Sequence, residues 1–153
     1  MKSNAYTCAV RLLARREHGA HELANKLAVK GYSDTAIQEA LQKCQRLGLQ
    51  SDDRFVEHVC HTRIRQGYGP VRIRQELQNL QIAREMIDAV LHLEQCNWLS
   101  HAMDVWKKKY KDDVEPSYAD VQKQKQFLLY RGFSVDTITQ IFKVVYIPST
   151  DEF

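Results

Sequence analysis

Two histidines on one helical stretch have the spacing closest to that of a metal site. His58 and His61 are three residues apart and share a helix face, next to Glu57. A zinc protease helix reads His-Glu-x-x-His, whereas the order here is Glu-His-Val-Cys-His, with neither a third ligand nor a base indicated. We therefore predict a polar helix face without a metal. His18 and His21 flank a turn, where we expect solvated rings or partners of a helix C-terminus.

Other groups that could support catalysis have ordinary structural explanations. Asp52 and Asp53 stand at a predicted helix start, where carboxylates face the positive helix end. Gly67 and Gly69 lead into Pro70 and follow no strand, so they predict a turn and not a phosphate loop. The four cysteines form no Cys-x-x-Cys pair and are expected to be free thiols in a reducing cytosol. We predict no catalytic residue, no metal and no cofactor.

Basic residues recur at one place in the pattern and are the best candidates for binding. They close the first helix of three predicted units or flank the turn after it: Arg11, Arg15, Arg16, Arg63, Arg65, Arg72, Arg74, Lys107, Lys108 and Lys109. One cation satisfies a helix dipole, an interaction worth about 0.3–1 kcal/mol, but each unit carries three or more. Two explanations stay open, namely solvated helix ends and a surface for an anionic partner.

The stretch around Tyr68 joins two of the predicted helices. Gly67 and Gly69 are expected to reverse the backbone through positive φ, and Pro70 suits the first position of the next helix. The ring of Tyr68 either packs over a helix end or, beside arginines, anchors an interface. The sequence leaves both roles open.

The spacing of apolar residues predicts helices along the whole chain. In the first unit, one helix runs from about residue 5 to 16, a second ends at Gly31, and Ser33 caps a third whose buried stripe extends to Leu47. A shift of 50 residues superimposes a second copy, with Gly19 on Gly69. A shift of 101 residues superimposes the second half of a third copy.

Repetition at this period predicts an all-α, elongated array of three tandem three-helix repeats. We assign them to residues 1–49, 50–96 and 97–146, the third being a variant with a longer internal loop, and expect a frayed tail at 147–153. No signal peptide is evident, and no apolar run approaches the roughly 18 residues of a membrane span. We expect a cytoplasmic monomer.

Several motifs in order along the chain resemble one known family. They are Leu13-Ala14-Arg15-Arg16-Glu17-His18 with Glu22-Leu23 and Lys26-Leu27, Asp52-Asp53-Arg54-Phe55, Gly67-Tyr68-Gly69-Pro70 with Arg72-Ile73 and Glu76-Leu77, and Phe127-Leu128 with Arg131-Gly132-Phe133-Ser134. The chain resembles the bacterial RecX family, regulators of the RecA recombinase. The resemblance implies tandem three-helix repeats, no enzyme activity, and binding to RecA and its DNA filament that restrains assembly, ATP hydrolysis and strand exchange.

The resemblance also adds Lys26 and Arg131 to the candidate contact residues. The formal net charge of +3 indicates at most weak, sequence-independent contact with DNA itself. Two alternatives remain: a direct DNA-binding protein built of helix-turn-helix-like modules, and a helical scaffold for an unrelated protein partner.

Overall fold

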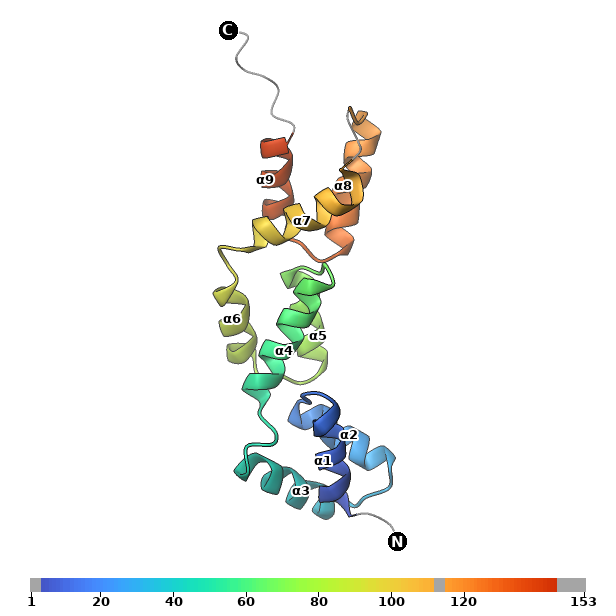
Figure 1. The fold of residues 1–153 in the computed structure, drawn as a ribbon, viewed down its shortest axis with the longest axis vertical. Coiled ribbons are helices and arrows are strands. Elements are labelled where there is room, and N and C mark those ends of the chain that lie inside the picture. The colour runs from blue at the N-terminus through green and yellow to red at the C-terminus, as the bar shows by residue number, and fades with distance from the viewer. Residues whose placement is uncertain (1–3, 112–114, 146–153) are drawn as a thin grey trace. The chain divides into compact units, whose positions relative to one another are not determined.

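The computed structural model consists of α-helices joined by short connections (Figure 1). It describes residues 4–111 and 115–145, so the tail expected at 147–153 lies outside the described residues. Within the described ranges the all-helical class is confirmed, with nine helices and no strand. The helices are α1 (Ala5–Arg15), α2 (Ala20–Val29), α3 (Asp34–Arg46), α4 (Asp52–Arg65), α5 (Pro70–Asn79), α6 (Arg84–Leu93), α7 (Trp98–Tyr110), α8 (Tyr118–Tyr130) and α9 (Val135–Val145). None of these helices is long and apolar enough to cross a membrane.

The chain divides into two compact units. Unit 1 comprises Met1–Val59 and Glu76–Val90, and unit 2 comprises Cys60–Gln75 and Leu91–Phe153. Helices α4 and α5 therefore each contribute residues to both units.

The core of unit 1 includes α1, α2 and α3, which pack against one another. Ser33 Oγ accepts a hydrogen bond from the Ala36 N–H at 3.2 Å, which confirms the predicted cap of α3. The predicted burial of Leu47 is wrong, because α3 ends one residue earlier and Leu47 is 58% exposed. The buried cluster consists of Ala5, Cys8, Ala9, Leu23, Leu27, Ile37, Ala40, Leu41 and Cys44.

The start of α2 is capped by a residue from α4. Asp52 Oδ1 accepts hydrogen bonds from the Ala20 N–H at 2.9 Å and from Gln50 Nε2 at 3.0 Å. Gly19 precedes α2 with a φ of −72°, and a Cβ there would lie 3.0 Å from Cδ2 of Phe55. The close approach of this ring, and not a positive φ, explains the glycine.

A buried polar network surrounds His18 in the turn before α2. His18 is 1% exposed, so the expectation of a solvated ring is wrong, whereas the alternative, a partner of a helix C-terminus, agrees with its contact to Arg16, the C-cap of α1. Its Nδ1 lies 3.0 Å from the Arg16 carbonyl oxygen, which only accepts, so Nδ1 carries the proton. Its Nε2 lies 3.1 Å from Lys26 Nζ and accepts from that ammonium group. The ring is therefore neutral. The backbone carbonyl of His18 accepts a hydrogen bond from Gln50 Nε2 at 3.2 Å.

The core of unit 2 includes α7, α8 and α9, with α7 packed against both other helices and α8 against α9. Trp106 Nε1 donates to Oε1 of the buried Gln124 at 2.8 Å, so this buried polar pair is satisfied. Ser117 and Asp120 form a capping box at the start of α8. Further buried side chains are Cys60, Ile73, Ala102, Leu128, Phe133, Ile138 and Ile141.

The turn before α5 packs on the turn between α8 and α9 through backbone atoms, all within unit 2. The Gly69 N–H donates to the Arg131 carbonyl at 2.8 Å, and the Val71 N–H donates to the Gly132 carbonyl at 2.9 Å. A Cβ at Gly69 would lie 2.5 Å from the Gly132 carbonyl oxygen. Gly67 has the predicted positive φ, +88°, but Gly69 does not. The reason predicted for Gly69 is thus wrong: close backbone contact requires it.

We predict that Gly69→Ala opens this backbone contact. The new methyl group meets backbone atoms that cannot rotate away, and overpacking of this kind costs about 1–3 kcal/mol. The Val71 amide should lose hydrogen-exchange protection. Gly31→Ala is the control, because its positive φ makes the change costly while no atom lies within 4 Å of the added Cβ. Unchanged protection of Val71 in Gly69→Ala would contradict the close-packing explanation.

We also predict an acid-sensitive contribution of His18 to stability. Burial lowers the pKa of His18 below its ordinary value of 6.5. The unfolded chain therefore binds this proton more readily, and the free energy of unfolding falls as the pH drops below 6.5 toward the lower folded pKa. Chemical denaturation of the wild type and His18→Gln between about pH 7.5 and 5.5 should show their stability difference shrinking on acidification, by at most about 1.4 kcal/mol per pH unit. A difference that stays constant would rule this out.

Candidate partner-binding site

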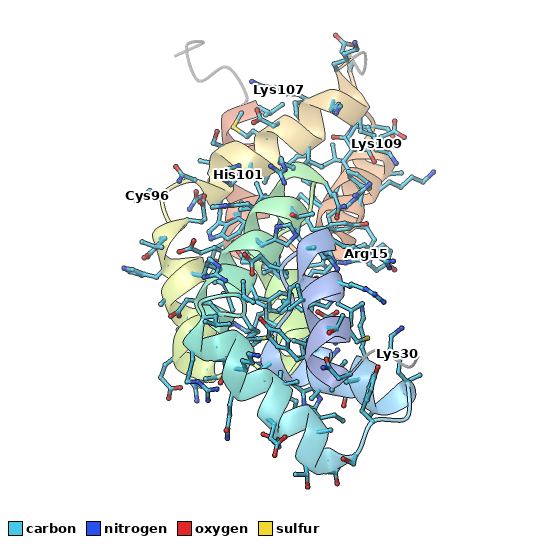
Figure 2. The ribbon with its side chains drawn as sticks, turned by 60° about the horizontal axis from the view of Figure 1, so that its bottom comes forward. Arg15, Lys30, Cys96, His101, Lys107 and Lys109 are labelled. Atoms are coloured by element: carbon cyan, nitrogen blue, oxygen red, sulfur yellow. The ribbon has the colours of Figure 1, made fainter. Side chains whose placement is uncertain are left out.

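Four predicted contact residues lie on or just after α1 and on α2, and they are of two kinds. Arg11 and Arg15 are exposed on α1, where Arg15 is labelled in Figure 2. Arg16 forms a bidentate ion pair with Glu22, with nitrogen–oxygen distances of 3.0 and 2.7 Å. Lys26 donates to the buried histidine ring described above. Arg16 and Lys26 therefore serve the fold of unit 1, and Arg11 and Arg15 are its better candidates for partner contact.

Cations and aromatic rings alternate in unit 2. The guanidinium carbons of Arg72 and Arg131 lie 4.0 and 5.0 Å from the ring centroid of Tyr68. Arg131 also lies 5.3 Å from the centroid of Phe127, over which Lys109 Nζ lies at 4.2 Å. These five residues are called the cation–aromatic row. Two neighbouring cations of the row share one ring. The distance between them is therefore at most the sum of their two distances to the centroid of that ring.

Each member of the row stands near a helix end. Tyr68 lies in the turn after α4, and Arg72 lies in the first turn of α5. Arg131 follows the last residue of α8, and Phe127 lies four residues earlier, on the same helix face. Lys109 belongs to the last turn of α7. Packing between distant segments thus brings three separate helix ends together.

Arg131 is the central residue of the row. Its Nη1 donates to the Gln66 carbonyl at 3.2 Å, and its own carbonyl accepts from the Gly69 N–H at 2.8 Å. Its guanidinium group contacts both rings of the row. The side chain and backbone of one residue therefore connect α8 to the turn before α5.

No described carboxylate neutralises the cations of the row. In the parts of the chain that the structure describes, Arg72, Arg131 and Lys109 form no ion pair with a carboxylate. A cation over an aromatic ring gains about 0.5–1 kcal/mol at an exposed site without being neutralised. The rings therefore hold positive charge in place and leave it available to an anionic partner.

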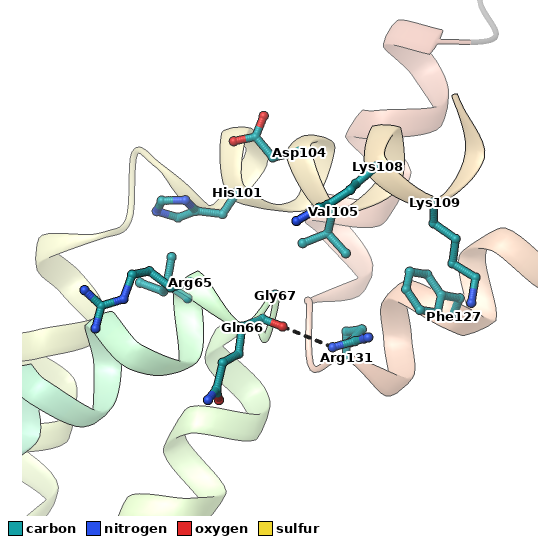
Figure 3. A pocket seen from close by; sticks show the side chains of 11 residues that line it. Arg65, Gln66, Gly67, His101, Asp104, Val105, Lys108, Lys109, Phe127 and Arg131 are labelled. Atoms are coloured by element: carbon teal, nitrogen blue, oxygen red, sulfur yellow. Dashed lines mark hydrogen bonds between the residues drawn. The ribbon is translucent and has the colours of Figure 1, made fainter. Parts of the chain in front are cut away.

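A pocket of about 510 Å³ opens beside the row, also within unit 2 (Figure 3). Arg65 projects from the end of α4 and Lys108 from α7, while Arg131 and Lys109 of the row line it as well. Asp104 is the single carboxylate among its lining residues, all of which are described. The arrangement is suited to binding anions.

The remaining predicted basic residues lie outside this pocket. Arg63 is half-buried and donates to Gln66 Oε1 at 2.9 Å, and Arg74 is half-buried in α5. Lys107 is exposed on α7 (Figure 2). The cations that the structure brings together are Arg65, Arg72, Lys108, Lys109 and Arg131, and their contact with a partner stays a prediction.

Sequence reasoning missed Phe127 as a member of the site. Its spacing of four residues before Arg131 is the signal that a helix model offers, because i and i+4 side chains are neighbours. Its contact with Lys109, from another helix, has no signal in the sequence. Sequence reasoning also missed Ile64 and Val105, which supply apolar lining of the pocket, because contacts between different helices leave no signal in the sequence.

The neighbouring titratable groups described below offer neither a reactive nucleophile nor a set of metal ligands. His101 Nε2 lies 3.0 Å from Glu94 Oε2, and this hydrogen bond holds the pKa of Glu94 below its ordinary 4.5. Burial raises the pKa of the Cys60 thiol to about 11, so this thiol is not a nucleophile near neutral pH. Across residues 4–111 and 115–145, no group of three or more His, Cys, Asp or Glu side chains is arranged to hold a metal.

Comparisons with known proteins identify the family of the chain. The family models described as the first, second and third three-helix domains of RecX match residues 5–44, 51–91 and 99–142. The chain is 52% identical over 143 residues to a regulatory protein RecX of Legionella pneumophila, covering 94% of this chain and 95% of that one. It is 40% identical over 133 residues to one of Pseudomonas putida, covering 87% and 85%.

The fold also matches a solved structure. The crystal structure of RecX from Lactobacillus salivarius superimposes with a TM-score of 0.80 at 24% identity, over 94% of this chain and 96% of that one. The predicted arrangement of three tandem three-helix domains is thus confirmed. On these matches, the chain belongs to the RecX family of regulatory proteins.

Proposed function

We propose that this chain is a non-enzymatic inhibitor of the RecA recombinase. It binds the RecA–DNA filament and restrains filament assembly, ATP hydrolysis and strand exchange. The family name supports RecA as the partner. The observation that carries the mode of action is the cation–aromatic row, whose charges no described carboxylate neutralises.

The row suits a polyanionic surface for two physical reasons. Complementary charge accelerates encounter and fixes orientation, and its effect is screened within about 8–10 Å at ordinary salt. Ordering a long side chain on binding costs about 0.5–1.5 kcal/mol, and the ring of Tyr68 already restricts Arg72 and Arg131. Less of the interaction energy is then lost on association.

Contacts from both units would add to one another. Arg11 and Arg15 on α1 provide exposed charge in unit 1, independent of the row in unit 2. Several weak contacts on one chain combine through effective concentration, so a cytoplasmic monomer can bridge neighbouring RecA subunits. A chain bound in this way obstructs subunit addition and the entry of a second DNA duplex.

Direct, sequence-independent DNA binding is the second candidate. It is favoured by the same observation, because neighbouring unneutralised cations also suit the phosphates of a nucleic acid backbone. Its affinity would fall steeply as salt rises, in proportion to the phosphates contacted. Tight binding to bare DNA at physiological salt would favour this candidate over filament inhibition.

We predict that the double variant Arg72→Glu/Lys109→Glu is a weaker inhibitor of RecA. It reverses the charges at the two ends of the row, so the concentration for half-inhibition of DNA-dependent ATP hydrolysis by RecA should rise about tenfold or more, which corresponds to about 1.4 kcal/mol. Helicity measured by circular dichroism should not change.

The matched control is Lys30→Glu/Arg46→Glu. These two residues are exposed in unit 1 and belong to neither the row nor the candidate contacts, yet the change in net charge is the same. The control should inhibit like the wild type. If the row variant inhibited as well as the control, the row would not contact the filament.

A further inference from the structure

The pocket beside the row has the size and lining of a site for a small molecule. Its volume of about 510 Å³ lies within the roughly 300–1,000 Å³ of such sites. The ends of α4 and α8 and one side of α7 line it, and it is open to solvent (Figure 3). Its lining combines the apolar side chains of Ile64 and Val105 with four cations, a mixture that suits an amphipathic ligand.

The charge in the pocket favours a ligand that carries several negative charges. Arg65, Lys108, Lys109 and Arg131 line it against the single acid Asp104. A carboxylate carries one negative charge, whereas a phosphate monoester carries about 1.5 to 2. Two or three linked phosphate groups match this lining better than an acidic peptide, whose charges are spread along a chain.

Side chains, and not the backbone, would hold the phosphate groups. The N–H groups of Gln66 and Gly67 already donate within the end of α4, to Thr62 at 3.1 Å and to Ile64 at 2.9 Å. Arginine offers a planar fork of N–H donors to phosphate, and lysine offers a mobile point charge. The pocket supplies two of each.

Phe127 gives the pocket an aromatic surface. Its ring is covered by Lys109 Nζ at 4.2 Å from the centroid (Figure 3). Lys109 is exposed and its side chain is flexible, so it can turn from the ring to a phosphate group. The part of the ring that Lys109 covers is then available to stack on a base, while Arg131 and Tyr110 keep their contacts with Phe127, at 5.3 and 5.7 Å from its centroid.

We propose that this pocket binds a nucleoside di- or triphosphate. The phosphate groups contact Arg65, Lys108 and Lys109, the base stacks on Phe127, and the sugar packs on Val105. Nucleotide binding at this site does not depend on the proposed binding to RecA, but a bound nucleotide would compete with it, because Lys109 belongs to both the pocket and the cation–aromatic row.

The test uses the full chain and isothermal titration calorimetry at fixed ionic strength, without RecA or DNA. The probes are ADP, inorganic pyrophosphate and citrate, so that base, phosphate and bare charge are compared. ADP should bind with one site per chain, about tenfold more tightly than pyrophosphate, and citrate should bind more weakly still. No saturable binding of ADP, or equal affinity for ADP and citrate, would overturn the proposal.

Variants then assign the contacts. Arg65→Ala/Lys108→Ala should weaken both ADP and pyrophosphate by about tenfold or more, whereas Phe127→Leu should weaken ADP alone. Arg46→Ala, exposed on α3, is the control and should bind as the wild type does. Unchanged ADP affinity in Arg65→Ala/Lys108→Ala would place the nucleotide elsewhere. Binding of single-stranded oligonucleotides but not of ADP would assign the pocket to a polymer and refute the proposal, leaving the RecA inhibition assay unaffected.

Discussion

The site in unit 2 depends on the close backbone contact between the turn before α5 and the turn after α8. Gly69 approaches Gly132 so closely that any side chain at Gly69 would collide with it, and two backbone hydrogen bonds, to the carbonyls of Arg131 and Gly132, join the turns. This contact places Tyr68 beside Arg131, and the guanidinium group of Arg131 also contacts Phe127. The local conformation of each helix alone would not bring these side chains together.

Basic residues in this chain are held in two different ways, with different consequences. Arg16 is paired with Glu22, so its charge is neutralised while it stabilises unit 1. Arg72 and Arg131 rest on Tyr68, which orders them and leaves the charge intact. An arginine on a carboxylate therefore serves the fold, whereas an arginine on an aromatic ring remains a candidate for binding an anionic partner.

Local patterns in the sequence predicted the helices, the cap at Ser33 and most of the core, because these follow from spacing along one helix. They did not predict the burial of His18, whose ring contacts the Arg16 carbonyl and Lys26 and whose backbone carbonyl accepts from Gln50 of a distant segment. Nor did they predict that Tyr68 and Arg131 meet. Such contacts join distant parts of the chain. Their geometry is set by packing between helices, which the spacing of residues along one helix does not predict. The resemblance identified the family but not these contacts.

The central claim is that the chain recognises RecA on DNA rather than DNA alone. The most direct measurement is its affinity for RecA filaments assembled on single-stranded DNA, compared with the same DNA without RecA at equal, physiological salt. We expect the filament to bind at least about tenfold more tightly, a difference of about 1.4 kcal/mol. Equal affinity for the filament and the bare strand would contradict the claim.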